Sequence, residues 1–233
     1  MLIGERNGLL SGLPYDAEVE YLESTGTQWI DTGYRPNSIT EISIVYKPEY
    51  YDTTFRCVYG VQASTGSQRF YLVLSGSNAY KIQISSVANG SSFCGFYTNG
   101  TLTDSANGDF APDNRRVSVV VNNPQKKVVL NGVEYAMPSW WGVNLYCQDS
   151  LALFGRKSGG AIQTANLFLG KIEGCNISED GSLVHDFIPV RKGTVGYLYD
   201  RVSGKLFRNQ GTGDFVIGPD KVSSVGGGII LNA

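Results

Sequence analysis

The chain has 233 residues, of which 42% are apolar and 17% charged, and it contains 29 glycines. This composition excludes a chain that is disordered throughout, and it is enough to bury the core of one large domain, as all-β sandwiches of this length often do. The formal net charge of −2 comes without a long basic run, so we expect no nucleic-acid binding. Nothing resembles a bilayer span or a cationic leader before an apolar run, so we expect a soluble, unexported chain without membrane insertion.

Residues 1–16 show no periodicity and include several glycines and Pro14. A segment interrupted by glycine and proline in this way is not expected to form a helix or a strand by itself. We therefore expect an N-terminal arm that becomes ordered only against another component, for example a partner subunit.

From Glu18 onward, short apolar runs are separated by turn signals. Apolar and polar residues alternate at 41–47, and apolar residues recur at every second position at 70–74 and 82–84. A period of two indicates strands that place one face on a core, because neighbouring side chains of a strand point to opposite sides. No sustained helical period is present, so we expect little helix.

Three further segments predict antiparallel hairpins. Residues 115–135 read as three strands joined by turns at 123–124 and 131–132, since Asn-Pro blocks ladder pairing and Asn-Gly suits a tight turn. Two more hairpins turn at 180–181 (Asp-Gly) and 203–204 (Ser-Gly). Many short antiparallel strands without crossover helices must bury their apolar faces against another sheet. We therefore expect an all-β, two-sheet antiparallel sandwich, a jelly roll, over residues 17–222.

The last segment, residues 223–233, places three apolar residues, 229–231, after a run of glycines. Two interpretations stay open. The tail is either a final edge strand on its own sheet or a segment that docks on a neighbouring chain.

The four cysteines lie far apart, and no two of them form a CxxC pair. This spacing argues against a zinc knuckle or a redox motif. Buried free thiols are the simpler interpretation, because such cysteines behave as small apolar residues, and disulfides are the alternative. The residues are Cys57, Cys94, Cys147 and Cys175.

Two stretches together resemble a known family. EYLESTGTQWIDTGYRP (20–36) and LFLGKIEGCNISEDGSLVHDFIPVRKGTVGYLYDRVSGKLFRNQGTGDF (167–215) are similar to laminin-G-like, concanavalin A-like sandwich modules of gut bacteria and their phages. The resemblance implies a concanavalin A-like sandwich in which the first and last strands lie side by side and the opening stretch is scaffold. The middle, 48–116, matches only in pattern, and ligand preference would reside there.

The sequence offers little support for catalysis. Glycoside hydrolases on related sandwiches need two carboxylates, commonly spaced Glu-x-Asp-x-x-Glu on one strand. Glu18, Glu20 and Glu23 come nearest, but the middle residue is not Asp and Glu23 has the wrong parity. The only histidine, His185, stands without a Gly-x-Ser-x-Gly elbow. We expect a non-enzyme with no catalytic residues and no cofactor.

The loop TDSANGDFAPDN (103–114) is a weak candidate for a calcium site. It supplies the hard oxygen ligands that calcium prefers, although the spacing matches no calcium-loop motif. An ordinary solvated loop uses the same residue types and is the simpler interpretation. The candidate ligands are Asp104, Asn107, Asp109 and Asp113.

Aromatic and amide residues make a better ligand site. Flat apolar rings beside amide groups are what a sugar site needs. Because adjacent residues of a strand point oppositely, one of two neighbouring tryptophans packs into the core and only the other could be a platform. The main candidates are Trp140, Trp141, Asn144 and Tyr146, and a second, weaker pair is Tyr97 and Asn99.

Three functional hypotheses follow. The first is a non-enzymatic structural or adhesion protein of a bacteriophage virion, such as a head fibre or tail-associated module. It would be assembled in the host cytoplasm, contact other virion proteins through its arm, form a homo-oligomer, with a trimer as our guess, and bind a host cell-surface glycan. The second is a carbohydrate-binding module of a bacterial surface protein, and the third a glycoside hydrolase.

Overall fold

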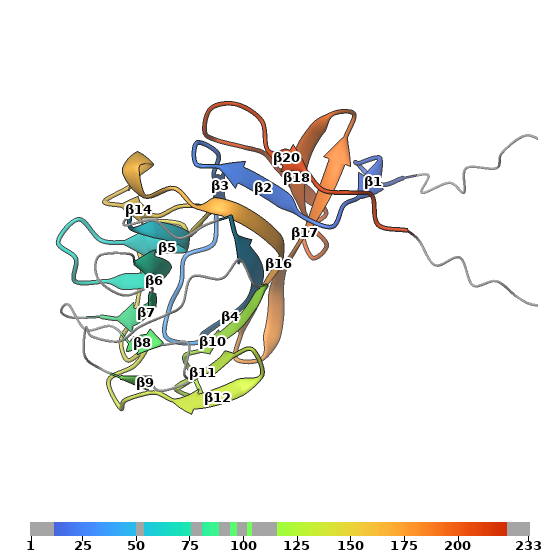
Figure 1. Ribbon diagram of the computed structural model, residues 1–233. Coiled ribbons are helices and arrows are strands. Elements are labelled where there is room, and N and C mark those ends of the chain that lie inside the picture. The colour runs from blue at the N-terminus through green and yellow to red at the C-terminus, as the bar shows by residue number, and fades with distance from the viewer. Residues whose placement is uncertain are drawn as a thin grey trace, which may run out of the picture.

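The computed structural model describes residues 12–49, 54–75, 81–88, 94–96, 102–103 and 116–222. Within these residues the chain forms two β-sheets that face each other (Figure 1). The only helical element among them is a 3-10 turn, η1 (Thr164–Asn166). The predicted all-β sandwich is thereby confirmed. In the described part of the chain, no helix is long and apolar enough to cross a membrane.

The larger sheet contains the strands that open and close the domain. They are β1 (Ala17–Glu18), β2 (Leu22–Thr25), β4 (Thr40–Pro48), β10 (Val117–Asn122), β11 (Lys127–Leu130), β12 (Val133–Ala136), β16 (Leu169–Glu179), β17 (Ser182–Lys192), β18 (Val195–Asp200), β19 (Lys205–Phe207) and β20 (Val216–Ile217). Its main path runs β12-β11-β10-β4-β16-β17-β18-β19. Beside this path, β1 pairs with β17, and β2 pairs with both β16 and β20.

The smaller sheet faces the first across the core. It contains β3 (Ile30–Asp31), β5 (Arg56–Gln62), β6 (Arg69–Ser75), β7 (Lys81–Val87), β8 (Cys94–Phe96), β9 (Leu102–Thr103), β13 (Ala152–Leu153), β14 (Lys157–Ser158) and β15 (Ala161–Ile162). Its path is β15-β14-β5-β6-β7-β8-β9, and β13 joins β3 to β5. The β14–β5 pair is parallel, whereas the other strand pairs of both sheets are antiparallel.

One hydrophobic cluster fills the space between the sheets. Ile42 and Ile44 of β4 and Phe70 and Leu72 of β6 are completely or almost completely buried in it. Ser43, between the two isoleucines of β4, points away from the core, whereas Tyr71, between Phe70 and Leu72, is buried in a smaller apolar cluster on the other face of its sheet. The core is thus built by the period of two that is visible in the sequence.

The predicted turns form where their residue types allow a left-handed backbone. Asn131 and Gly132 have φ values of 49° and 84°, and Asp180 and Gly181 have 45° and 79°. Asn, Asp and Gly tolerate this region better than other residues, which explains why the strands reverse there. The three predicted hairpin regions are confirmed as β10–β11–β12, β16–β17 and β18–β19.

The two ends of the described chain lie together. β1 pairs with β17, and Val19 forms a bridge with Asp220. Figure 1 places this end of the molecule on the right, whereas the β5–β6 turn lies at the left. The predicted tail, 223–233, and residues 1–11 of the predicted arm lie outside the described residues.

The end of the predicted arm packs on the domain. Tyr15 is buried, and its ring centroid lies 4.9 Å from that of Tyr199 in β18. The Asp16 N–H donates to the Arg191 carbonyl at 2.8 Å. Tyr15 and Asp16, which the prediction assigns to the arm, therefore contact the domain, and Tyr15 covers an apolar patch on β17 and β18.

Three cysteines are buried free thiols: Cys57, Cys147 and Cys175. Burial raises the pKa of Cys57 and of Cys147 to about 12, and it also raises that of Cys175. These thiols act as apolar packing groups, as the sequence predicts. The side chain of Cys94 lies outside the description.

Candidate functional site

The opening stretch, residues 20–34, is held by a buried amide. Oε1 of Gln28 accepts hydrogen bonds from the Thr25 N–H (2.8 Å) and the Ser24 hydroxyl (3.1 Å). Nε2 of the same residue donates to the Asp214 carbonyl at 3.1 Å. The amide is therefore engaged in fastening two distant parts of the backbone and is not available to a ligand.

Further contacts join this stretch to the end of the domain. The Thr27 hydroxyl donates to the Thr212 carbonyl at 2.8 Å, and the Trp29 N–H donates to Oδ1 of Asn209 at 3.1 Å. β2, the strand that lies in this stretch, pairs with β20, the last strand of the described chain. The scaffold role predicted for the opening stretch is confirmed by these bonds.

Of the three acids of the opening stretch, only Glu20 lines one of the two cavities described below, so no two of them face a cavity together. Glu23 is half-buried, with its Oε2 3.6 Å from Nζ of Lys171. Burial raises the pKa of Glu23, Lys171 lowers it and the neighbouring carboxyl of Glu49 raises it, so the net shift is upward. Neither Glu23 nor Glu49 lines either of the two cavities described below.

The single histidine belongs to a hydrogen-bond cluster that lacks the order of a catalytic triad. Nδ1 of His185 lies 2.8 Å from Oδ2 of Asp200, and the Ser203 hydroxyl donates to the same oxygen at 2.6 Å. The serine thus bonds to the acid and not to the imidazole, so it has no base to activate it. Burial raises the pKa of Asp200, but the Asp186 N–H, Ser203, His185 and another backbone N–H outweigh it and leave the pKa lowered.

A cavity of about 650 Å³ lies between the β5–β6 turn and the segment 146–149. We call it the Tyr146 hollow. The Tyr146 side chain is 62% exposed, and Asp149 is the only charged residue in the lining. Hydroxyl and amide groups make up most of the remaining polar wall. The lining residues are Val61, Ala63, Ser64, Thr65, Ser67, Gln68, Tyr146, Cys147, Gln148, Asp149 and Gly159.

Backbone contacts hold Tyr146 at the rim of this hollow. Its N–H donates to Oε1 of Gln68 at 2.9 Å, and Nε2 of Gln68 donates to the Ala88 carbonyl at 3.0 Å. The next residue, Cys147, is buried and donates its N–H to the Pro36 carbonyl at 2.8 Å. The backbone of Tyr146 is therefore held in place while its aromatic ring faces solvent. This is the arrangement of a pre-formed binding platform.

The predicted sugar-binding residues differ in burial and in position relative to the hollow. Trp141 is completely buried in the core, so it is not available as a platform, and we correct its assignment as a ligand-binding residue. Trp140 is 37% exposed, and Asn144 is exposed with φ of 55°. Of the four main candidates, only Tyr146 lines the hollow.

The remaining candidates fall outside the described residues, and the structure does not place them. In the described part of the chain, no group of three or more His, Cys, Asp or Glu residues is arranged to hold a metal ion. The candidates in question are Tyr97, Asn99, Asp104, Asn107, Asp109 and Asp113.

Sequence reasoning missed the opposite wall of the hollow. Ser64, Thr65 and Ser67 belong to the polar turn between β5 and β6, and the Thr65 and Ser67 hydroxyls lie 2.7 Å apart. Across the cavity, Asp149 accepts a hydrogen bond from the Gly160 N–H at 2.7 Å. The concentration of small polar residues in the segment 63–68 is a local signal for a turn, but nothing in it indicates that Tyr146 lies opposite.

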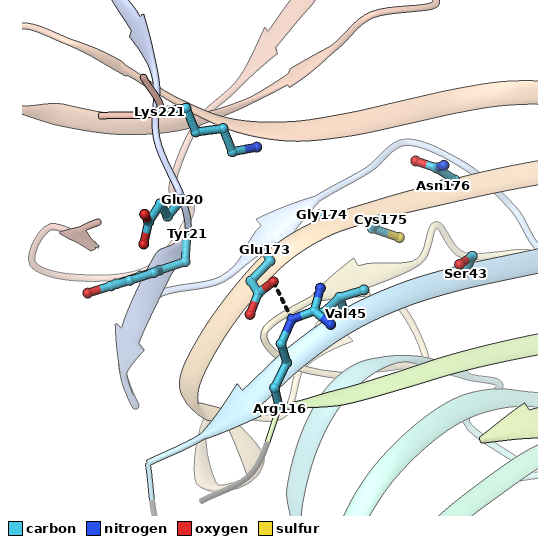
Figure 2. A pocket seen from close by; sticks show the side chains of 10 residues that line it. All are labelled: Glu20, Tyr21, Ser43, Val45, Arg116, Glu173, Gly174, Cys175, Asn176 and Lys221. Atoms are coloured by element: carbon cyan, nitrogen blue, oxygen red, sulfur yellow. Dashed lines mark hydrogen bonds and ion pairs between the residues drawn. The ribbon is translucent and has the colours of Figure 1, made fainter. Parts of the chain in front are cut away.

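A second cavity, of about 440 Å³, opens on the outer face of the larger sheet. We call it the fork pocket. It contains an ion pair in which Nε of Arg116 donates to Oε2 of Glu173 at 2.7 Å (Figure 2). Its lining combines charged, amide and hydroxyl groups with a single aliphatic side chain, Val45. The lining residues are Glu20, Tyr21, Ser43, Val45, Arg116, Glu173, Gly174, Cys175, Asn176 and Lys221.

Comparisons with known proteins show the fold. The sequence matches no protein-family model and no curated protein. The structure is similar to that of a Bacteroides ovatus protein provisionally described as carbohydrate-binding, with a TM-score of 0.51 and 11% identity, covering 88% of this chain. This chain spans 61% of the length of that protein.

Two other solved structures are more distant. They are the CBM40 module of a Ruminococcus gnavus IT-sialidase (TM-score 0.43, 15% identity, 68% of this chain and 89% of that one) and a SAP-like pentraxin of Limulus polyphemus (TM-score 0.48, 8% identity, 88% and 96%). At such identities a likeness indicates architecture and not ligand or activity. The chain is therefore an all-β sandwich of the jelly-roll kind.

Proposed function

We propose that the protein is a non-enzymatic glycan-binding module whose ligand site is the Tyr146 hollow. The observation that carries this proposal is an aromatic side chain, 62% exposed, in a cavity whose polar wall is otherwise made mainly of hydroxyl and amide groups. Sugars stack their apolar faces on aromatic rings and exchange hydrogen bonds with neutral polar groups. Since no Lys or Arg is among the described residues that line the hollow, we expect a neutral glycan.

The finer proposal is that this module serves as an adhesion protein on a bacteriophage virion. The resemblance of residues 20–36 and 167–215 to modules of gut bacteria and their phages supports it. So does the placement of the described chain ends, which lie at the opposite side of Figure 1 from the β5–β6 turn that borders the hollow. A domain attached to a particle by its ends would then present the hollow outward, and we propose that it does so as a trimer.

A carbohydrate-binding module of a bacterial surface protein is the second candidate, because the same site and the same orientation would serve it. The neighbouring genes distinguish the two. Capsid or tail genes beside this one favour the virion, and a transport or polysaccharide-use cluster favours the bacterial surface. Light scattering of the full chain tests the trimer, which a monomeric mass would contradict.

The test of glycan binding is a glycan array followed by titration calorimetry on any neutral glycan retained. We expect Tyr146→Ala to weaken binding by about tenfold or more, because the stacking surface is lost. Tyr146→Phe, which keeps the ring, should retain most of the affinity. Trp140→Ala is the matched control: it removes an exposed aromatic ring that does not line the hollow.

Two results would remove the proposal. One is an array on which the wild type retains no glycan. The other is a glycan whose binding depends on Trp140 and is unchanged in Tyr146→Ala, which would move the site to the other side of the 138–146 loop. Release of reducing sugar by the wild type would contradict the non-enzymatic part.

A further inference from the structure

The fork pocket exists because β16 changes its partner. Residues Leu169–Ile172 of this strand pair with β2, whereas Cys175–Glu179 pair with β17. Between them the register against β4 also shifts, at Ile172/Gly174. Such a bulge adds a residue to one strand and redirects its side chain. β2 and β17 therefore diverge at Glu173, and the gap between them opens into the pocket.

Glu173 fixes the orientation of a cationic group at this gap. Its Oε2 accepts a hydrogen bond from Nε of Arg116 at 2.7 Å, and this is the only hydrogen bond of Arg116 within the described chain. Among the described residues, the two terminal nitrogens of the guanidinium group have no hydrogen-bond partner. Figure 2 shows them turned away from Glu173, toward the side where Val45 and Asn176 lie. A guanidinium held in this way presents a flat pair of donors that matches a carboxylate.

The other charges around the pocket add a second cation. In Figure 2 the Lys221 side chain extends toward the side of the view on which Glu173 and Gly174 lie, whereas the Glu20 carboxylate points in the opposite direction, away from Arg116. The lining contains two carboxylates and two cations, but with Glu20 turned away the other three, Arg116, Lys221 and Glu173, sum to a charge of +1. The pocket thus favours an anion, although the formal net charge of the whole chain is −2.

The neutral part of the lining indicates what carries the anion. Asn176 is exposed and Ser43 is half-exposed, and both come from the outer faces of paired strands, with Val45 beside them. An amide and a hydroxyl next to one small aliphatic group suit a polyhydroxylated ring. A peptide is less suitable, because β4 is paired on both edges and offers no free edge for strand addition.

We propose that the fork pocket is a second binding site, specific for the carboxylate of an acidic saccharide. Arg116 and Lys221 bind the carboxylate, Asn176 and Ser43 bind hydroxyl groups of the ring, and Glu173 is a positioning residue for Arg116. The volume of about 440 Å³ lies within the range of small-ligand cavities, roughly 300–1,000 Å³. The site shares no lining residue with the Tyr146 hollow, so it does not depend on the function proposed there.

The experiment is titration calorimetry of the full chain with two acidic probes, trigalacturonate and the methyl glycoside of N-acetylneuraminic acid. The methyl ester of each probe is the matched neutral ligand. We expect at least one acid to bind about tenfold or more tightly than its ester, and its affinity to fall as salt is added. Arg116→Ala should lower that affinity by about tenfold or more, because the paired donors are lost.

Control variants separate this site from other causes. Arg35→Ala removes an exposed arginine that lines neither cavity and should bind like the wild type. Tyr146→Ala should also leave the affinity for the acidic probe unchanged. The proposal for the fork pocket and the proposal for the Tyr146 hollow can therefore be contradicted separately. If Arg116→Ala shows no thermal unfolding transition, and so is not folded, Lys221→Ala gives a second test. Lys221 is exposed and lies near the end of the described chain. Binding of neither acid, equal binding of acid and ester, or unchanged binding in both cation variants would overturn the proposal.

Discussion

Gln28 is a polar residue that the fold treats as part of its interior. It is only 2% exposed, and both ends of its amide are hydrogen-bonded to backbone groups, the Thr25 N–H and the Asp214 carbonyl. A buried backbone group that loses its partner costs more than the hydrogen bond itself contributed, because no water replaces it. The residue therefore ties the first strands of the domain to the last loop.

We predict that Gln28→Ala lowers the free energy of unfolding by about 3 kcal/mol, since it removes the hydrogen bonds to the Thr25 N–H and the Asp214 carbonyl and leaves a cavity in place of the buried amide. Urea unfolding followed by tryptophan fluorescence measures the change. Thr27→Val is the comparison, because Thr27 makes one exposed hydrogen bond, to Thr212, and we expect a loss below about 1 kcal/mol. Equal losses in the two variants would show that the Gln28 network is not special.

Asp200 supports a second prediction, on pH dependence. The carboxyl is fully buried and its pKa is lowered, since hydrogen bonds from Asp186, Ser203, His185 and Val202 outweigh the effect of burial. A group whose pKa is lower in the folded state stabilises the fold above its unfolded pKa, about 3.9, and this contribution is lost as the pH falls through the folded value. We expect Asp200→Asn to cost about 3 kcal/mol at pH 7.

The free-energy difference between the wild type and Asp200→Asn should therefore shrink between pH 5 and pH 2.5, where the wild type loses the charged form. Urea unfolding at a series of pH values gives both curves. A difference that stays constant over this range would mean that the charge of Asp200 contributes nothing and that only the shape of the side chain matters.

At the scale of elements, the close approach of the last loop to the opening turn depends on Gly211. A Cβ atom placed there would lie 1.9 Å from the Thr27 carbonyl oxygen and 3.1 Å from the Cα of Gln28. Both are backbone atoms, so the obstacle cannot turn aside as a side chain would. The contact between these two segments is therefore possible only with glycine.

We predict that Gly211→Ala lowers the free energy of unfolding by about 3 kcal/mol, because the loop must move away from the opening turn. Gly193→Ala is the matched control. It has φ of 59° and no neighbour within 4 Å, so it carries only the strain of a left-handed alanine, about 1 kcal/mol. Chemical denaturation of the two variants measures both losses of unfolding free energy. Equal losses would mean that the last loop can move away from the opening turn without destabilising the fold.

The elements differ in how far the sequence predicts them. The hairpins at 131–132 and 180–181 follow from the turn residues themselves, which act over a few positions. The Tyr146 hollow does not follow, because its walls come from residues 63–68 and 146–149, and only the folded sheet brings them together. The fork pocket depends on the change of strand partner that β16 makes at Glu173. No local residue pattern predicts such a change. The prediction that one of the two tryptophans is buried was correct, but the sequence did not indicate that it was Trp141.

At the scale of the whole molecule, one buried cluster contains residues of both sheets. Cys147 and Cys175 belong to it, and Cys57 lies on the outer side of β5, whose next residues, Val58 and Tyr59, are also in the cluster. Cys147 and Cys175 cannot reach solvent unless the packing between the sheets is lost, and Cys57 is covered on its own face by Tyr71 and Val73. Unfolding is therefore expected to be a single cooperative transition.

We predict that these three thiols react with a thiol reagent only when the whole domain unfolds. Burial raises the pKa of Cys57 and Cys147 to about 12, so reactive thiolate is scarce at pH 8 as well as inaccessible. In a Cys94→Ser background, we expect no labelling without denaturant and complete labelling in concentrated urea. The midpoint of labelling, measured with short pulses, should coincide with the midpoints from fluorescence and circular dichroism. If Cys57 became labelled at lower urea than Cys147 and Cys175, the smaller sheet would open separately, and the domain would contain two cooperative units joined by β13 and β3.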